Sequence, residues 1–128
     1  MKVFSISCSA VMAFILVSIG AAHAGAINTP IIFLGSGTQL VCIANNVTAS
    51  PVAVSVRIVG QSTTTTQNCT LPAGDRNGCQ AFKNGESGHC TIIINNVTSA
   101  EVAQRVRGVM FSRKTVAPFA MEGTVQAQ

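Results

Sequence analysis

Cysteine is the residue type whose possible chemistry is clearest in this 128-residue chain. Cys8 lies in an apolar N-terminal stretch, and the other four cysteines are Cys42, Cys69, Cys79 and Cys90. An even number of cysteines in a small exported domain is typical of disulfides. A structural zinc site usually contains a pair of cysteines only a few residues apart, and no such pair occurs here. The cysteines therefore predict two disulfides and no metal site.

Catalysis would need a nucleophile, acid or base held in a pocket. Beyond residue 24 the sequence contains one histidine, His89, and one aspartate, Asp75. His89 directly precedes Cys90, and successive strand residues point to opposite faces. If Cys90 faces the core, His89 faces solvent. The sequence therefore predicts a protein that is not an enzyme and has no catalytic residue, cofactor or metal.

Basic residues gather in the stretch RVRGVMFSRK, which contains Arg105, Arg107, Arg113 and Lys114. A nucleic-acid site would need aromatic stacking platforms, and the few phenylalanines must also serve the core, so we expect no nucleic-acid binding. A basic strand face could instead contact an unknown protein or an anionic envelope component. The simpler alternative is a solvated strand face.

The N-terminus predicts export. Met1 and Lys2 precede an apolar run over residues 3–20, and Ala22-His23-Ala24 follows. This order is typical of a cleaved signal peptide, residues 1–24. A retained membrane anchor is the alternative, since the apolar run approaches the length of a spanning helix. Cleavage would leave residues 25–128 as one domain with no transmembrane segment.

The elements that must position these residues are strands. Val, Ile and Thr dominate, and turn residues divide short apolar runs as in a β-sandwich. We expect strands near Pro30–Leu34, Thr38–Ala44, Val52–Val59, Ser62–Leu71, Cys79–Phe82, His89–Asn95 and Arg105–Ser112, with a last one around Thr115–Phe119. The runs LVCIA and CTIII are apolar on both faces, which favours central strands. A bulge at Gly108 would point Val109 and Phe111 inward and Arg107 outward.

The domain contains an internal sequence repeat. NNVTASPVAVSVRIV (residues 45–59) and NNVTSAEVAQRVRGV (residues 95–109) are identical at nine of fifteen positions. This predicts one strand–turn–strand unit used twice, although SAEVAQRV could alternatively form a helical turn capped by Ser99. The Asn-x-Thr tripeptides in both copies, and a third at Asn68, are also possible glycan acceptors.

The repeat bears on the disulfide pairing. Cys42 and Cys90 fall on the same face of equivalent strands, which favours a Cys42–Cys90 bridge through the core and a Cys69–Cys79 bridge closing the loop CTLPAGDRNGC. The uncrossed alternative, Cys42–Cys69 with Cys79–Cys90, remains open at this point.

The stretches VCIANNVTASPVAVSV, CTLPAGDRNGC, GHCTI and RVRGV, over residues 40–112, resemble small exported bacterial proteins with an immunoglobulin- or fibronectin-III-like sandwich. The resemblance implies an all-β, immunoglobulin-like antiparallel sandwich over residues 25–128 and a secreted or periplasmic location, and it points to no activity. We therefore expect an envelope-associated binding or structural module. The alternative is an inhibitor of a secreted hydrolase that presents Asp75 and Arg76 on the Cys69–Cys79 loop.

Overall fold

The computed structural model describes residues 23–75, 77–116 and 121–128. In these ranges the chain forms eight strands and one short helix. Their order is β1 (Ala24–Asn28), β2 (Thr38–Asn46), β3 (Val52–Gly60), β4 (Thr64–Leu71), β5 (Cys79–Asn84), β6 (Gly88–Asn95), α1 (Ser99–Arg105), β7 (Val106–Lys114) and β8 (Met121–Gln126).

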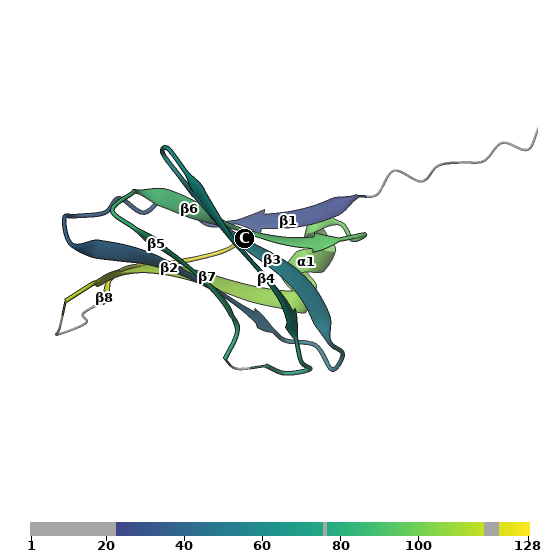
Figure 1. Ribbon diagram of the computed structural model, residues 1–128. Helices are drawn as coiled ribbons and strands as arrows, with labels where there is room; N and C mark the ends of the chain where they lie inside the picture. Colours follow the sequence, from purple (N-terminus) through teal and green to yellow (C-terminus); the bar gives the residue numbers. More distant parts are fainter. Residues whose placement is uncertain (1–22, 76, 117–120) are drawn as a thin grey trace, which may run out of the picture.

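The strands form two four-stranded antiparallel sheets packed as a sandwich (Figure 1). One has the order β1-β6-β3-β4 and the other β5-β2-β7-β8; we name them the β6–β3 sheet and the β2–β7 sheet after their interior strands. This arrangement confirms the predicted antiparallel sandwich. It also confirms that LVCIA and CTIII belong to interior strands, since they lie in β2 and β6.

The core lies between the sheets because alternate residues of the interior strands are mostly apolar. In β3 the inward side chains are at most 6% exposed, and they belong to Val52, Val54, Val56 and Ile58. Ala53 and Arg57, between them, are exposed. Burial of one such face removes apolar surface from water, which is the main favourable term in folding.

The two halves of the chain have the same topology. Exchanging β1 with β5, β2 with β6, β3 with β7 and β4 with β8 converts one sheet order into the other. In each half an interior strand ends at an Asn-Asn-Val-Thr corner, and the chain crosses there to the opposite sheet. The repeat seen in the sequence is therefore a repeat of structure.

The two copies differ by one helical turn, which confirms the helical alternative for residues after Thr98. Ile43 and Ile93 are equivalent in the fifty-residue repeat. Their ladder partners, Val109 and Ser55, are 109 − 55 = 54 residues apart. The four additional residues form most of α1, whose N-cap is Thr98 and not Ser99.

Three sequence expectations for strands need correction. Pro30–Leu34 is not a strand, although Ile32 makes one isolated bridge to Gly88. The first and last strands are instead β1 and β8, whose segments AGAIN and MEGTVQ carry weak strand signals. Thr115 and Val116 lie outside any strand, and the rest of the expected Thr115–Phe119 strand lies outside the described residues.

The expected bulge at Gly108 is wrong. Pairing between β2 and β7 is regular from Thr38–Lys114 to Asn46–Val106. Gly108 faces the core, where a side chain would overlap Ile92. A register shift occurs instead between Ser112 and Arg113, in the pairing of β7 with β8. Val109 and Phe111 consequently point outward, the reverse of the expectation.

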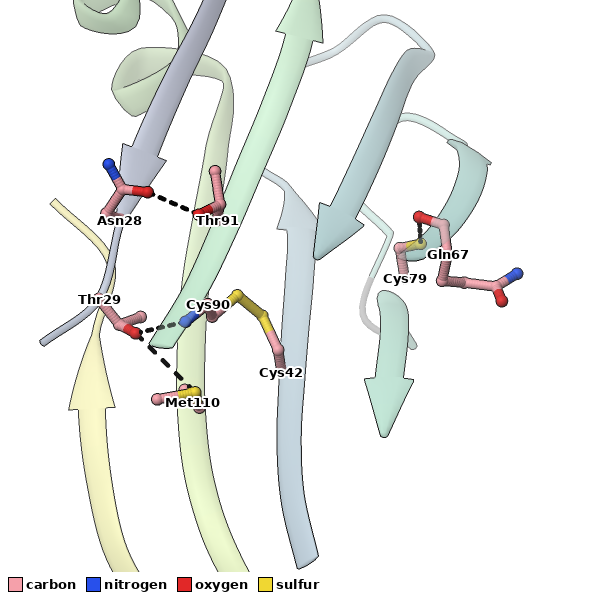
Figure 2. The surroundings of a disulfide bond; sticks show 8 residues. All are labelled: Asn28, Thr29, Cys42, Gln67, Cys79, Cys90, Thr91 and Met110. Carbon is pink, nitrogen blue, oxygen red and sulfur yellow. Dashed lines mark hydrogen bonds between the residues drawn. A yellow bond between two sulfur atoms is a disulfide. The ribbon is translucent and has the colours of Figure 1, made fainter. Parts of the chain in front are cut away.

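Two disulfides link the halves of the chain. Cys42–Cys90 joins the interior strands β2 and β6, with a Cα–Cα distance of 6.0 Å. It lies beside Thr29, whose hydroxyl accepts a hydrogen bond from the Cys90 amide (2.9 Å; Figure 2). Cys69–Cys79 joins β4 to β5, with Cα atoms 5.8 Å apart. Two disulfides indicate an oxidising, extracytoplasmic compartment.

None of the helices in the described residues is long and apolar enough to cross a membrane.

Candidate functional site

The basic residues singled out in the sequence separate into two groups. Arg107 and Arg113 lie on β7, at odd positions that face outward from the β2–β7 sheet. Arg105 instead ends α1, where it forms an ion pair with Glu101 (N–O distance 3.6 Å). Lys114 is the exposed last residue of β7. Arg105 therefore does not belong to the basic strand face expected from the sequence, because the strand begins only at Val106.

An apolar stripe lies between Arg107 and Arg113. We use this name for the outward residues Val41, Ile43, Phe82, Val109 and Phe111. The register places Phe82, Val41 and Phe111 in one row across three strands, and Ile43 beside Val109 in the next. Phe82 is 40% exposed, whereas Val41, in the middle of its row, is 1% exposed. The stripe thus combines a close-packed base with accessible aromatic surface.

Arg113 borders the stripe at one end. Its Nε donates a hydrogen bond to Gln39 Oε1 (3.0 Å). Its guanidinium carbon lies 5.5 Å from the centroid of the Phe82 ring, within the range of a cation–π interaction. Its terminal nitrogens find no acceptor among the described residues, so they are oriented and remain able to bind a carboxylate in two-point geometry.

Arg107 borders the other end. One of its terminal nitrogens donates to the carbonyls of Ala103 and Val106, the latter at 3.2 Å. Its row neighbour is Asn45, whose Oδ1 is buried and has no hydrogen-bond donor among the described residues. A hollow of about 210 Å³ opens here, lined by Asn45, Arg107, Gly108, Val109, Gln126 and Ala127. This end therefore combines an exposed cation, Arg107, with a buried acceptor on Asn45 that has no hydrogen-bond donor among the described residues.

Three of the four acidic residues lie outside the strands of this face. Glu101 belongs to the α1 cap, where hydrogen bonds from Thr98 lower its pKa. Asp75 lies in the β4–β5 loop. Glu86, in the β5–β6 turn, accepts a hydrogen bond from the Ser62 hydroxyl (2.6 Å) and pairs with Lys83 at 3.5 Å.

The Glu86 cluster holds two turns together. Hydrogen bonds from the Ser62 hydroxyl and amide are the main reason that its pKa falls from 4.5 to about 2. Lys83 also contacts Thr63, so the β3–β4 turn is fastened to the β5–β6 turn. This cluster is structural, because its polar groups are directed at one another.

In the Cys69–Cys79 loop, Asp75 is half-buried and its carboxylate is bound within the loop. The two carboxylate oxygens of Asp75 accept hydrogen bonds from the amides of Asn77 (3.1 Å) and Gly78 (2.9 Å). The Gly74 amide donates to Thr48 O (3.0 Å), which fastens the loop to the first corner. Arg76 lies outside the described residues.

His89 lies in β6 on the outer face of the opposite sheet, while its neighbour Cys90 is fully buried. Within the described ranges no group of three or more His, Cys, Asp or Glu residues could hold a metal ion. A hollow of about 310 Å³ on the β6–β3 sheet is lined only by neutral residues, including Ser55, Asn68 and Asn95.

The apolar part of the candidate site was missed in the sequence because of the bulge placed at Gly108. Without it, Arg107, Val109, Phe111 and Arg113 share one face by simple alternation. Phe82 could not be placed by any local pattern, since its position beside Arg113 depends on how β5 and β7 flank β2. No protein-family model, curated protein or solved structure matches this chain.

Proposed function

We propose that this protein is a secreted or periplasmic, non-enzymatic binding module of the cell envelope, whose β2–β7 face binds a partner protein with an acidic rim around an apolar centre. One observation carries the proposal: the apolar stripe is exposed at Phe82 and bordered by Arg113 and Arg107. Aromatic residues and arginine are the types most enriched where protein interfaces concentrate their binding energy.

The geometry favours binding over catalysis. Arg113 is held by Gln39 and Phe82, so little side-chain entropy would be lost when a carboxylate binds it. A flat, strand-borne surface also suits a protein partner better than a small molecule, which usually needs a concave pocket.

The proposal includes removal of residues 1–24 as a signal peptide and an immunoglobulin-like domain over residues 25–128. A disulfide between interior strands of two packed sheets supports the likeness. The likeness is one of architecture, because β1 neighbours β6 here, whereas the first two strands are neighbours in a constant-type immunoglobulin domain.

A site-directed crosslinking experiment tests the binding face. A photoreactive phenylalanine analogue at position 82 should crosslink to one envelope protein in the intact cell, whereas the analogue at Thr66, on the other sheet, should not. Arg113→Glu with Arg107→Glu should abolish the adduct by repelling an acidic rim. Arg57→Glu, which changes an exposed arginine on the opposite face, is the control. An adduct that survives the double change, or is lost equally in the control, would contradict the proposal.

A second candidate, inhibition of a secreted hydrolase by the Cys69–Cys79 loop, is favoured by the rigidity of that loop. The disulfide and the Asp75 hydrogen bonds reduce the ordering cost of insertion into an active site. Its test is stoichiometric loss of hydrolase activity on addition of the protein, with Asp75→Ala and a Cys69→Ser/Cys79→Ser variant as loosened loops. Unchanged inhibition by both loosened variants would exclude the loop.

A further inference from the structure

Four large apolar side chains are strongly exposed in the β1–β2 loop and the β7–β8 hairpin, where Met121 is the first residue of β8. Phe33 is 79% and Ile31 58% exposed in the β1–β2 loop, and Val116 is 74% and Met121 68% exposed in the β7–β8 hairpin. The β1–β2 loop and the adjoining ends of β7 and β8 lie at the left end of the sandwich in Figure 1, opposite the end that carries α1. Soluble domains rarely gather exposed apolar side chains in this way without a binding role.

Hydrogen bonds hold the two loops together. The Thr115 amide and hydroxyl both donate to Gly37 O, at 3.0 and 2.9 Å. The Leu34 amide donates to Ser87 Oγ (2.8 Å), which fixes the β1–β2 loop against the β5–β6 turn. The apolar side chains therefore project from a supported end of the molecule, and we call Ile31, Phe33, Val116 and Met121 the apolar end.

Positive charge lies immediately behind the apolar end. Arg113 and Lys114 complete β7 just before the hairpin. Of the acids nearby, Glu86 is compensated by Lys83 at 3.5 Å, and Glu122 follows Met121 in the sequence. Exposed apolar residues in front of cations are the pattern of a surface that enters the headgroup layer of an anionic membrane.

We infer that the apolar end docks this protein on an anionic lipid surface. Phe33, Val116 and their neighbours would leave water for the acyl boundary, while Arg113 and Lys114 would remain at the phosphate level. A protein partner on the β2–β7 face is not required for this contact, so the inference goes beyond the proposed function. Either proposal can be wrong while the other holds. Charge favours a lipid surface over a second copy of this basic chain, which would place like charges together.

Vesicle sedimentation tests the inference with protein recovered after export, its N-terminus read by mass spectrometry. Vesicles of phosphatidylcholine with about one third phosphatidylglycerol should bind the protein, and pure phosphatidylcholine should bind it roughly thirtyfold more weakly, because about 1 kcal/mol is lost with the anionic lipid for each of the two cations. Phe33→Ser with Val116→Ser should weaken binding by at least about tenfold through lost apolar transfer. Val47→Ser, which changes an exposed apolar residue beside the end of α1, should leave binding unchanged.

A tryptophan reporter provides a second, position-specific measurement, because the chain contains no tryptophan. With Phe33→Trp, anionic vesicles should shift the emission to the blue, and lipids brominated on the acyl chain should quench it. With Phe82→Trp they should do neither. No vesicle binding, equal binding by the double serine variant, or equal quenching at both positions would overturn the inference. If the protein does not bind vesicles but forms dimers that the serine changes dissociate, the apolar end contacts a second copy of the chain instead.

Discussion

The two Asn-Asn-Val-Thr corners begin with the same four residues and adopt different structures. The first, at residues 45–48, is a compact turn between β2 and β3, and the second, at residues 95–98, leads into α1. The first corner contacts the end of α1, since the Val47 amide donates to the carbonyl of Arg105 (3.0 Å). Local sequence identity therefore did not determine local structure here.

Asn46 organises the first corner from a buried position. Its side-chain nitrogen donates to the carbonyls of Ser50 (2.7 Å), Leu71 (3.2 Å) and Pro72 (2.9 Å). Its Oδ1 accepts from the amide and hydroxyl of Thr48 (2.9 and 2.8 Å). Asn46 is 2% exposed, so a glycan on this residue is incompatible with the fold.

Asn96, the equivalent residue in the second corner, is exposed and has a φ of 61°. It reverses the chain, and Thr98 then caps α1. The Thr98 hydroxyl accepts from the Glu101 amide (3.3 Å), and the Glu101 carboxylate accepts from the Thr98 amide (2.7 Å), which is a capping box.

The residue three positions after each threonine explains the difference. It is Glu101 in the second corner and Pro51 in the first. Proline has no amide hydrogen for the threonine to accept, and it disfavours helical backbone at the preceding residue, Ser50. Pro51 therefore directs the chain straight into β3, whereas Glu101 allows one helical turn before β7.

The largest expected difference between the two corners is in the effect of changing Asn46. Asn46→Ala should lower the free energy of unfolding by about 3 kcal/mol, because buried carbonyl groups lose their donor. Asn96→Ala should cost only about 1 kcal/mol, the strain of alanine in left-handed backbone. Urea denaturation of both variants provides the measurement. Equal losses would show that the corners are energetically equivalent after all.

Thr98→Ala should have the next largest effect. Loss of the N-cap typically costs about 1 kcal/mol, and the amides at the start of α1 should exchange faster with solvent. Thr48→Ala is the matched change in the first corner. It should leave exchange in α1 unaltered, so hydrogen-exchange NMR distinguishes the two corners. Faster α1 exchange in both variants would contradict the assignment of the cap to Thr98.

The second corner should also respond to acid, with a smaller effect. Hydrogen bonds from Thr98 lower the pKa of Glu101. The resulting stability is therefore fully present above the ordinary carboxyl pKa and is lost as pH falls through the lower, folded value. Thermal unfolding between pH 6 and pH 3 should show less acid loss in Glu101→Gln than in the parent. The remaining loss should come mainly from Glu86, whose pKa is about 2. An unchanged pH profile in Glu101→Gln would refute the contribution of Glu101 to stability.

The smallest effect is expected for Asn96→Gly. Glycine adopts positive φ without steric cost, so stability should change by less than about 0.5 kcal/mol, in either direction. Asn46→Gly should be as damaging as Asn46→Ala. A large loss for Asn96→Gly would mean that the Asn96 side chain makes an essential contact.

Much of the architecture could be predicted because strand alternation and the repeat are local signals. The alternating valines of β3 and the parity of Cys42 and Cys90 needed no knowledge of partners. β1 and β8 escaped prediction because their segments gain strand structure from the neighbours β6 and β7. The candidate site was only half predicted: Arg107 and Arg113 were identified, but their position beside Phe82 was not.

The sequence by itself determined that this chain is a β-sandwich with a repeated unit, because period-two apolar patterns and turn residues act within a few neighbouring positions. Only the tertiary structure decided which copy of Asn-Asn-Val-Thr is buried, which residues of β7 face outward, and that Phe82 meets Arg113. Those outcomes depend on ladder register and on contacts between residues distant in the chain, such as Asn46 with Leu71 and Pro72.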